Sequence, residues 1–135
     1  DDCSTQRNLD AAGREQAVAL GEALRRQSIV VDRLLTSPWC RCRETAALLD
    51  VGTPEDYAPL GYVFSNRAAE ADSTAALRSR IAAWRGAGTL VMISHGATIG
   101  ALTGIQPQQG EILVVEPQSG SDAGFRIVGR IPPEE

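Results

Sequence analysis

Thr89-Leu90-Val91-Met92-Ile93-Ser94-His95-Gly96 is a short apolar run that ends on the only histidine of this sequence. The run has the length of a buried strand, and the apolar segment after it, residues 97–103, predicts a helix that stops at Gly104. In open α/β proteins, the loops at the carboxyl ends of parallel strands carry the chemistry. The fold class expected from this stretch is α/β, with His95 as the candidate catalytic or anion-binding side chain.

The composition fits one domain over residues 1–135. The chain has 135 residues, of which 43% are hydrophobic, and this is enough for a sizeable core. A net charge of −4 argues against general binding to nucleic acid or to an anionic membrane surface. No run approaches the roughly 18 apolar residues of a membrane span. A start at Asp1, without methionine or a signal-peptide pattern, predicts a processed chain or a fragment. The sequence does not decide between a cytoplasmic location and a periplasmic or secreted one. It also leaves the oligomeric state open.

The three cysteines, Cys3, Cys40 and Cys42, allow three interpretations. In the first interpretation, all three are reduced thiols in a cytosolic protein. In the second, Cys3 is bridged to Cys40 or Cys42 in an oxidising compartment. The third interpretation, a zinc site of the three cysteines with His95, is disfavoured because Cys-x-Cys is not the usual zinc spacing.

Two strand-to-helix units indicate a parallel sheet with helical crossovers. Residues 29–36 predict a strand, and a helix over residues 39–49 follows it, with Pro38 suited to the first helical position. The second unit is the His95 strand and its helix. Upstream, Asp10 should cap a helix over residues 11–27. That helix should pack against the sheet through a narrow stripe of Ala17, Leu20, Gly21 and Leu24.

The rest of the chain gives weaker signals. Residues 51–72 have no clear period and predict an irregular excursion that shapes the mouth of a site. Ser73 can cap a helix over residues 74–85. Residues 111–116 and 124–131 predict a hairpin or two adjacent strands, and residues 132–135 a frayed tail.

Two arginines could join His95. A helix that starts directly after a strand turns its N-terminal amides toward the strand end and favours an anion, and Arg41 lies in its first turn. Ser4-Thr5-Gln6-Arg7-Asn8 supplies a further arginine just before a helix. A serine-hydrolase dyad of Ser94 and His95 is disfavoured, because adjacent strand residues point to opposite faces and the sequence has no Gly-x-Ser-x-Gly elbow.

Three motifs, which follow one another along the chain in the order of the family, resemble the histidine phosphatase superfamily, also called the phosphoglycerate-mutase-like fold. Ser37-Pro-x-x-Arg41-x-x-x-Thr45-Ala46 is similar to the segment with its second phosphate-binding arginine, and Ser94-His95-Gly96 to its second catalytic histidine. Arg7-Asn8-Leu9-x-x-x-Gly13-Arg14-x-Gln16-Ala17 resembles the start of the first helix in short, SixA-type members. Gly110-Glu111 resembles the element that follows the second histidine.

The resemblance implies a three-layer α/β/α fold with a mostly parallel central sheet. It also implies phosphoryl transfer from a phosphate monoester or a phosphorylated protein through a phosphohistidine. Arg7 and Arg41 would clamp the phosphate, and His95 would be the second, electrostatic histidine. It implies no cofactor and no metal, since positive side chains supply the charge. The short 51–72 segment implies a shallow site, and no residue matches the family's general acid.

The sequence departs from the family at its start. The nucleophile of the family lies in an Arg-His-Gly motif at the end of a first, central strand, beside the strand that ends at His95. We expect this strand and nucleophile roughly 20–30 residues upstream of Asp1, which makes the domain N-terminally incomplete. The alternative is a non-catalytic phosphate-binding or interaction module. The family geometry also implies that a bridge from Cys3 to the Arg41 helix would hold the two arginine-bearing segments together.

Overall fold

The computed structural model describes residues 3–61, 66–118 and 120–133. Residues 62–65 of the predicted excursion and residues 134–135 of the predicted tail lie outside this range. The elements, in chain order, are η1 (Cys3–Thr5), α1 (Ala11–Arg26), β1 (Val31–Thr36), α2 (Cys40–Leu49), β2 (Pro54–Asp56), η2 (Ala58–Leu60), α3 (Arg67–Ala82), β3 (Thr89–Ile93), α4 (Gly96–Thr103), β4 (Ile112–Pro117) and β5 (Phe125–Ile131).

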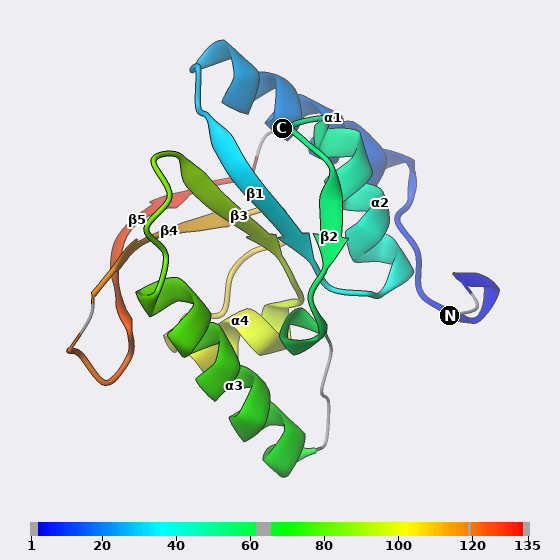
Figure 1. Ribbon diagram of the computed structural model, residues 1–135. Helices are drawn as coiled ribbons and strands as arrows, with labels where there is room; N and C mark the ends of the chain where they lie inside the picture. Colours follow the sequence, from blue (N-terminus) through cyan, green and yellow to red (C-terminus); the bar gives the residue numbers. More distant parts are fainter. Residues whose placement is uncertain (1–2, 62–65, 119, 134–135) are drawn as a thin grey trace.

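The strands form two sheets (Figure 1). The first has the order β2-β1-β3, and all its strands are parallel, with Leu34 opposite Val91 and Thr36 opposite Ile93. The second is the antiparallel pair β4-β5. The predicted parallel sheet with helical crossovers and the C-terminal hairpin are therefore confirmed.

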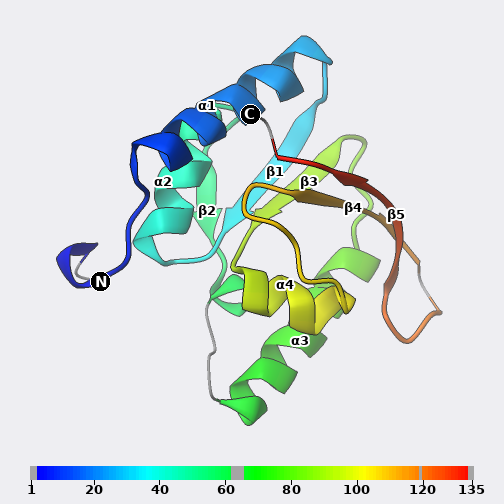
Figure 2. The same cartoon turned by 180° about the vertical axis from the view of Figure 1, so that it is seen from behind.

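The parallel sheet separates two cores. Leu34 packs with Ala46 and Leu49 of α2, whereas its neighbour Leu35 packs with Leu77 of α3 and with η2. Consecutive strand residues point to opposite faces, so these clusters lie on the two sides of the sheet. Figures 1 and 2 show α1 and α2 on one side and α3 and α4 on the other. This is the three-layer α/β/α arrangement that the family resemblance implies.

Helix α1 begins where expected but packs differently. The Asp10 side chain accepts a hydrogen bond from the Gly13 amide at 2.8 Å, as an N-cap does. The main partner of the small-residue stripe is α2 and not the sheet, which corrects the prediction. A Cβ at Gly21 would lie 2.0 Å from the carbonyl oxygen of Leu49, so this crossing requires glycine. Leu20 alone reaches the cluster around Leu34.

Helix α2 starts at Cys40, later than predicted. Trp39 is its N-cap, with the extended backbone angles φ −70° and ψ 145°. Pro38 therefore precedes the cap and does not occupy the first helical position. The helix ends at Leu49 as expected, and Asp50 adopts a left-handed conformation after it.

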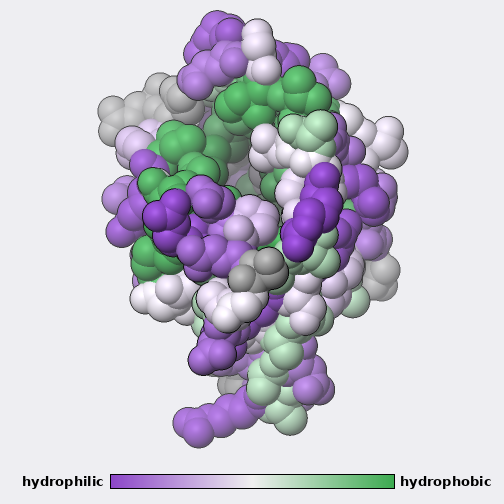
Figure 3. Space-filling model, turned by 60° about the vertical axis from the view of Figure 1, so that its left-hand side comes forward, coloured by the Kyte–Doolittle hydropathy of each residue, from purple (hydrophilic) through white to green (hydrophobic). Residues whose placement is uncertain are grey.

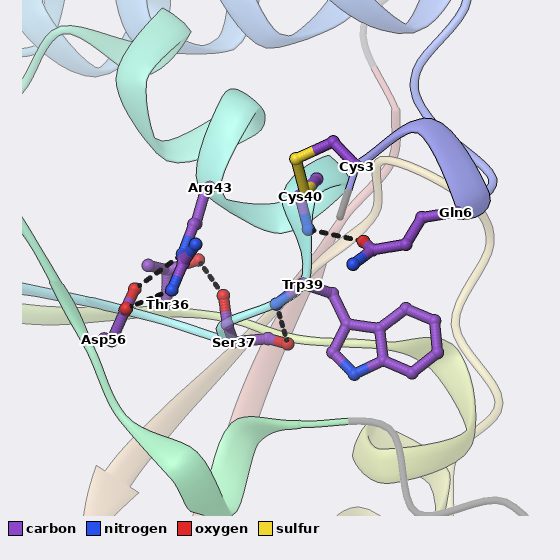
Figure 4. Close-up of polar contacts among 8 residues, drawn as sticks. All are labelled: Cys3, Gln6, Thr36, Ser37, Trp39, Cys40, Arg43 and Asp56. Carbon is purple, nitrogen blue, oxygen red and sulfur yellow. Dashed lines mark hydrogen bonds and ion pairs between the residues drawn. A yellow bond between two sulfur atoms is a disulfide. The ribbon is translucent and has the colours of Figure 1, made fainter. Parts of the chain in front are cut away.

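The segment predicted to be irregular contains strand β2, which pairs in parallel with β1. Two ion pairs anchor this short strand. Arg33 contacts Glu55 at 2.6 Å, and Arg43 of α2 holds Asp56 through both carboxylate oxygens (Figure 4). A three-residue strand of Pro-Glu-Asp has no apolar alternation, so periodicity could not reveal it.

Helix α3 starts two turns earlier than predicted. Asn66 caps it by accepting from the Ala69 amide at 3.0 Å, and the helix runs from Arg67 to Ala82. Ser73 thus lies inside the helix and is not its cap. Helix α4 ends as predicted at Gly104, which has the positive φ of 78° that favours glycine. No helix in the described ranges is long and apolar enough to cross a membrane.

Candidate functional site

The site lies where β1 and β3 end. Because these strands are parallel and in register, Ser37 and His95 follow neighbouring strand ends. The Ser37 amide donates to the Ile93 carbonyl at 2.9 Å and extends the ladder by one bond. The Ser37 Oγ lies 2.8 Å from His95 Nε2, and the two residues are 0% and 4% exposed. The chain thus buries its only histidine at the carboxyl edge of the sheet.

Arg41 holds the other side of the imidazole. Its Nη2 lies 2.8 Å from His95 Nδ1, and a guanidinium can only donate, so Nδ1 accepts. In the neutral ring, Nε2 then carries the proton and donates to Ser37 Oγ. Trp39 completes the contact, with Arg41 stacked 5.1 Å from its ring and His95 edge-on at 5.5 Å. The structure therefore brings Arg41 and His95, two of the predicted site residues, into direct contact.

The imidazole is neutral at pH 7. Burial and, second, the positive charge of Arg41 lower the pKa of His95 from 6.5 to about 4. The buried Cys42 thiol lies 3.8 Å from Nε2 and donates to the Ser94 carbonyl. Burial raises the pKa of Cys42, outweighing the opposing effects of Ser37 and Arg41, so it stays a thiol. Among the contacts described around His95, Arg41 alone brings a charge.

Ser94 points away from His95. Its hydroxyl donates to the Leu60 carbonyl at 2.6 Å, on the η2 side of the sheet. This agrees with the opposite directions expected for adjacent residues. The serine that meets His95 is Ser37, whose contact with the imidazole sequence reasoning did not predict. The available signal was that two parallel strands, each followed by a helix, must end side by side.

Arg7 is exposed in the segment before α1, and the polar contacts described for His95 do not include it. Its segment is nevertheless attached to α2. Cys3 and Cys40 form a disulfide, and the Gln6 Oε1 accepts from the Cys40 amide at 2.8 Å (Figure 4). The bridge predicted between Cys3 and the Arg41 helix is thereby confirmed. The alternatives of three reduced thiols and of a zinc site built from three thiolates are wrong.

The N-terminal amides of α2 are less available than predicted. Gln6 occupies the Cys40 amide, and the Trp39 amide donates to Ser37 Oγ at 3.3 Å. An anion at this end would therefore meet side chains before it met free amides. Within the part of the chain that the structure describes, no cluster of three or more His, Cys, Asp or Glu residues could hold a metal ion.

Glu111 fixes the start of the β4-β5 hairpin. Its carboxylate accepts from Arg130 and from the Gln108 amide, and its side chain is 4% exposed. The Arg130 hydrogen bond, followed by the Gln108 amide, lowers the pKa of Glu111 to about 2. In this structure the Glu111 carboxylate therefore stabilises the hairpin through its contacts with Arg130 and Gln108.

Residues 4–61 match the family model described as the histidine phosphatase superfamily, branch 1. The match covers 58 of the 135 residues and agrees with the resemblance of the sequence motifs to this superfamily. The matched segment contains Arg7, Ser37 and Arg41, and it ends before β3 and His95. The parallel α/β sheet agrees with the fold of this phosphatase and mutase-like superfamily. A comparison with curated proteins finds no match.

Proposed function

We propose that this protein is a phosphohydrolase that acts on a phosphate monoester or a phosphorylated protein, and that Arg41, Arg7 and His95 bind the phosphoryl group. The observation that carries the proposal is the contact between Arg41 and the buried His95 at the carboxyl edge of the parallel sheet. A guanidinium held by an aromatic ring at such an edge suits the oxygens of a phosphate.

The coupling between Arg41 and His95 suggests how the site would respond to an anion. Without ligand, Arg41 donates to Nδ1 and helps to keep the imidazole neutral. A phosphate dianion beside Arg41 would offset this charge and accept from the guanidinium, which frees Nδ1. The pKa of His95 would then rise, so the bound phosphate would gain a second cationic donor. Exposed Arg7 would supply the third group by turning toward the ligand.

His95 is poorly placed to attack phosphorus, since both its nitrogens are engaged, Nδ1 by Arg41 and Nε2 by Ser37. We therefore assign the nucleophile to a histidine upstream of Asp1, on a strand beside β3, as in the SixA-type branch. The phosphohistidine would form there. The cationic groups on this chain would neutralise the equatorial oxygens during transfer.

The surface around β3 supports such a strand. In the described residues β3 is paired on one edge only, and its apolar residues, Leu90 to Ile93, are only half-buried. In β1, by contrast, Leu34 to Thr36 are buried. Parallel sheets are normally covered on both faces, and proteins usually protect an exposed strand edge by pairing or covering it. On the side of the molecule where β4 and β5 lie, hydrophobic side chains border a hollow (Figure 3). Val114 of β4 and Val128 of β5 are exposed.

A non-catalytic phosphate-binding or interaction module is the second candidate. It is favoured by the engagement of both nitrogens of the only histidine in this sequence. Such a module would bind phosphate at Arg41 without turnover and without a phosphohistidine.

Turnover of p-nitrophenyl phosphate by the gene product with its upstream sequence tests the proposal. Arg41→Gln should lower kcat/KM by about a hundredfold or more, as loss of a transition-state donor does. Arg126→Gln, which removes an exposed arginine of β5, is the matched control and should keep full activity. Equal activity of the two variants would contradict the assigned role of Arg41. The non-catalytic module would be favoured if the protein binds phosphate but shows neither turnover nor an acid-labile phosphohistidine.

A further inference from the structure

The segment that carries Arg7 is attached to α2 at Cys40. Cys3 is bridged to Cys40, and three residues later Gln6 accepts from the amide of the same Cys40. Figure 4 shows both contacts meeting at the first residue of α2. Arg7 follows Gln6, and Arg41 follows Cys40, so this double attachment ties the backbone next to Arg7 to the backbone next to Arg41.

Little else about the segment is buried. Between Cys3 and Asn8, every residue except Gln6 is exposed, and Gln6 itself is only half-buried. Its turn is stabilised locally, by the Gln6 amide and the Asn8 side chain, which both donate to the Cys3 carbonyl. Burial therefore contributes little to its position, and the covalent link to α2 contributes much.

The two cysteines of the bridge differ in exposure. Cys3 is exposed, whereas Cys40 is 8% exposed. An incoming thiolate can thus attack Cys3 Sγ, and Cys40 is the leaving group. Cys40 opens α2, and the N-terminal end of a helix stabilises a departing thiolate. The third cysteine, Cys42, is buried against His95 and is the free thiol of the set.

We propose that the Cys3–Cys40 disulfide is a redox clamp that holds Arg7 at the phosphate site, so that its reduction weakens phosphate binding. The proposal rests on the function proposed above. The reductant is a dithiol. One of its thiolates attacks Cys3 Sγ, the Cys3–Cys40 bond breaks, and Cys40 leaves and takes up a proton. The second thiol of the reductant then displaces Cys3. The dithiol ends as a disulfide, and Cys3 and Cys40 end as thiols, a transfer of two electrons.

Of the two described contacts at Cys40, reduction leaves the Gln6 hydrogen bond, and one neutral hydrogen bond is weak compared with a covalent link. The effective concentration of Arg7 at the site falls as its segment moves away from α2. The expected effect is an approximately tenfold weaker affinity for phosphate, the scale of one lost charge-assisted hydrogen bond.

Calorimetric titration with inorganic phosphate tests the clamp. The oxidised chain should bind about tenfold more tightly than the chain reduced with dithiothreitol, with thiol counts of one and three under denaturing conditions. Cys3→Ser should bind as weakly as the reduced protein and should not respond to dithiothreitol. Arg7→Gln should bind weakly in the oxidised state and lose nothing more on reduction.

Hydrogen exchange at the Cys40 amide, which Gln6 protects, measures release of the segment without phosphate and should accelerate on reduction. Phosphate affinity that is equal in both redox states overturns the clamp alone. Tight binding by oxidised Arg7→Gln overturns the clamp and also the phosphate-binding role proposed for Arg7. A folded, oxidised protein that binds no phosphate overturns the proposed function, and with it the role of the clamp. Thermal unfolding of each variant checks that it is folded.

Discussion

The protonation of His95 gives a quantitative test of the site geometry. It is the only histidine in the chain, so one imidazole resonance in an NMR spectrum reports its charge. Burial and the neighbouring Arg41 should hold its pKa near 4 in the folded protein, against 6.5 for the free side chain. We therefore expect this resonance to stay unchanged from pH 8 to about 5.5 and to shift only below that.

The same pKa predicts how stability depends on pH. Between pH 6.5 and 4 the unfolded chain binds a proton at His95 and the folded chain does not, so stability rises with pH in this window. Because the pKa of His95 is lower in the folded than in the unfolded chain, its contribution to the free energy of unfolding is fully present above pH 6.5. This contribution is lost as the pH falls toward 4. The difference of 2.5 pKa units, at 1.36 kcal/mol each, gives a loss of about 3 kcal/mol between pH 7 and 4.

Urea unfolding of the wild type and of His95→Gln at pH 7, 5.5 and 4 isolates this contribution. Carboxylates that titrate in the same range are common to both proteins and cancel in the comparison. The free energy of unfolding of the wild type should fall by about 3 kcal/mol more than that of the variant. An imidazole that titrates near 6.5, or equal pH dependence of the two proteins, would refute the burial and the Arg41 contact on which the site is built.

Two further predictions test the contacts around the site. Arg41→Gln should raise the pKa of His95 but leave it below 6.5, because burial is the larger cause, and NMR titration of the variant measures this; an unchanged pKa would mean that Arg41 does not face the ring. Gly21→Ala should lower the free energy of unfolding by about 2 kcal/mol or more, because its Cβ would overlap the Leu49 carbonyl. Gly13→Ala, on the same helix but facing side chains that can move, should be neutral or stabilising by up to about 1 kcal/mol, and equal effects of the two would contradict the packing of α1 on α2.

Much of the fold follows from local sequence signals. The Asp10 cap and the Gly104 stop each have a local chemical cause, and the structure has both. The missed features depend on contacts between distant residues. Strand β2 exists because its backbone pairs with β1 and because Arg43 binds Asp56. The first turns of α3 have strong helix formers but no apolar stripe, so periodicity placed its start too late.

The site was predictable to the extent that the topology determines it. Parallel strands ending side by side bring the helix that carries Arg41 to His95. The partner atoms were not predictable, because the contact of Ser37 with Nε2 depends on register and on side-chain rotamers. The position of Arg7 was harder still, since a loop residue has no periodicity that fixes the direction of its side chain. Its role, like the catalytic roles of Arg41 and His95, stays a prediction.

The most direct test of the phosphate site is the pKa of His95 measured by NMR with and without saturating inorganic phosphate. A phosphate anion held by Arg41 stabilises the imidazolium, so the pKa should rise from about 4 toward or above 6.5, in a saturable manner. The rise should disappear in Arg41→Gln and persist in Arg126→Gln. A pKa that stays near 4 at every phosphate concentration would contradict the assignment of Arg41 and His95 as a phosphate-binding pair.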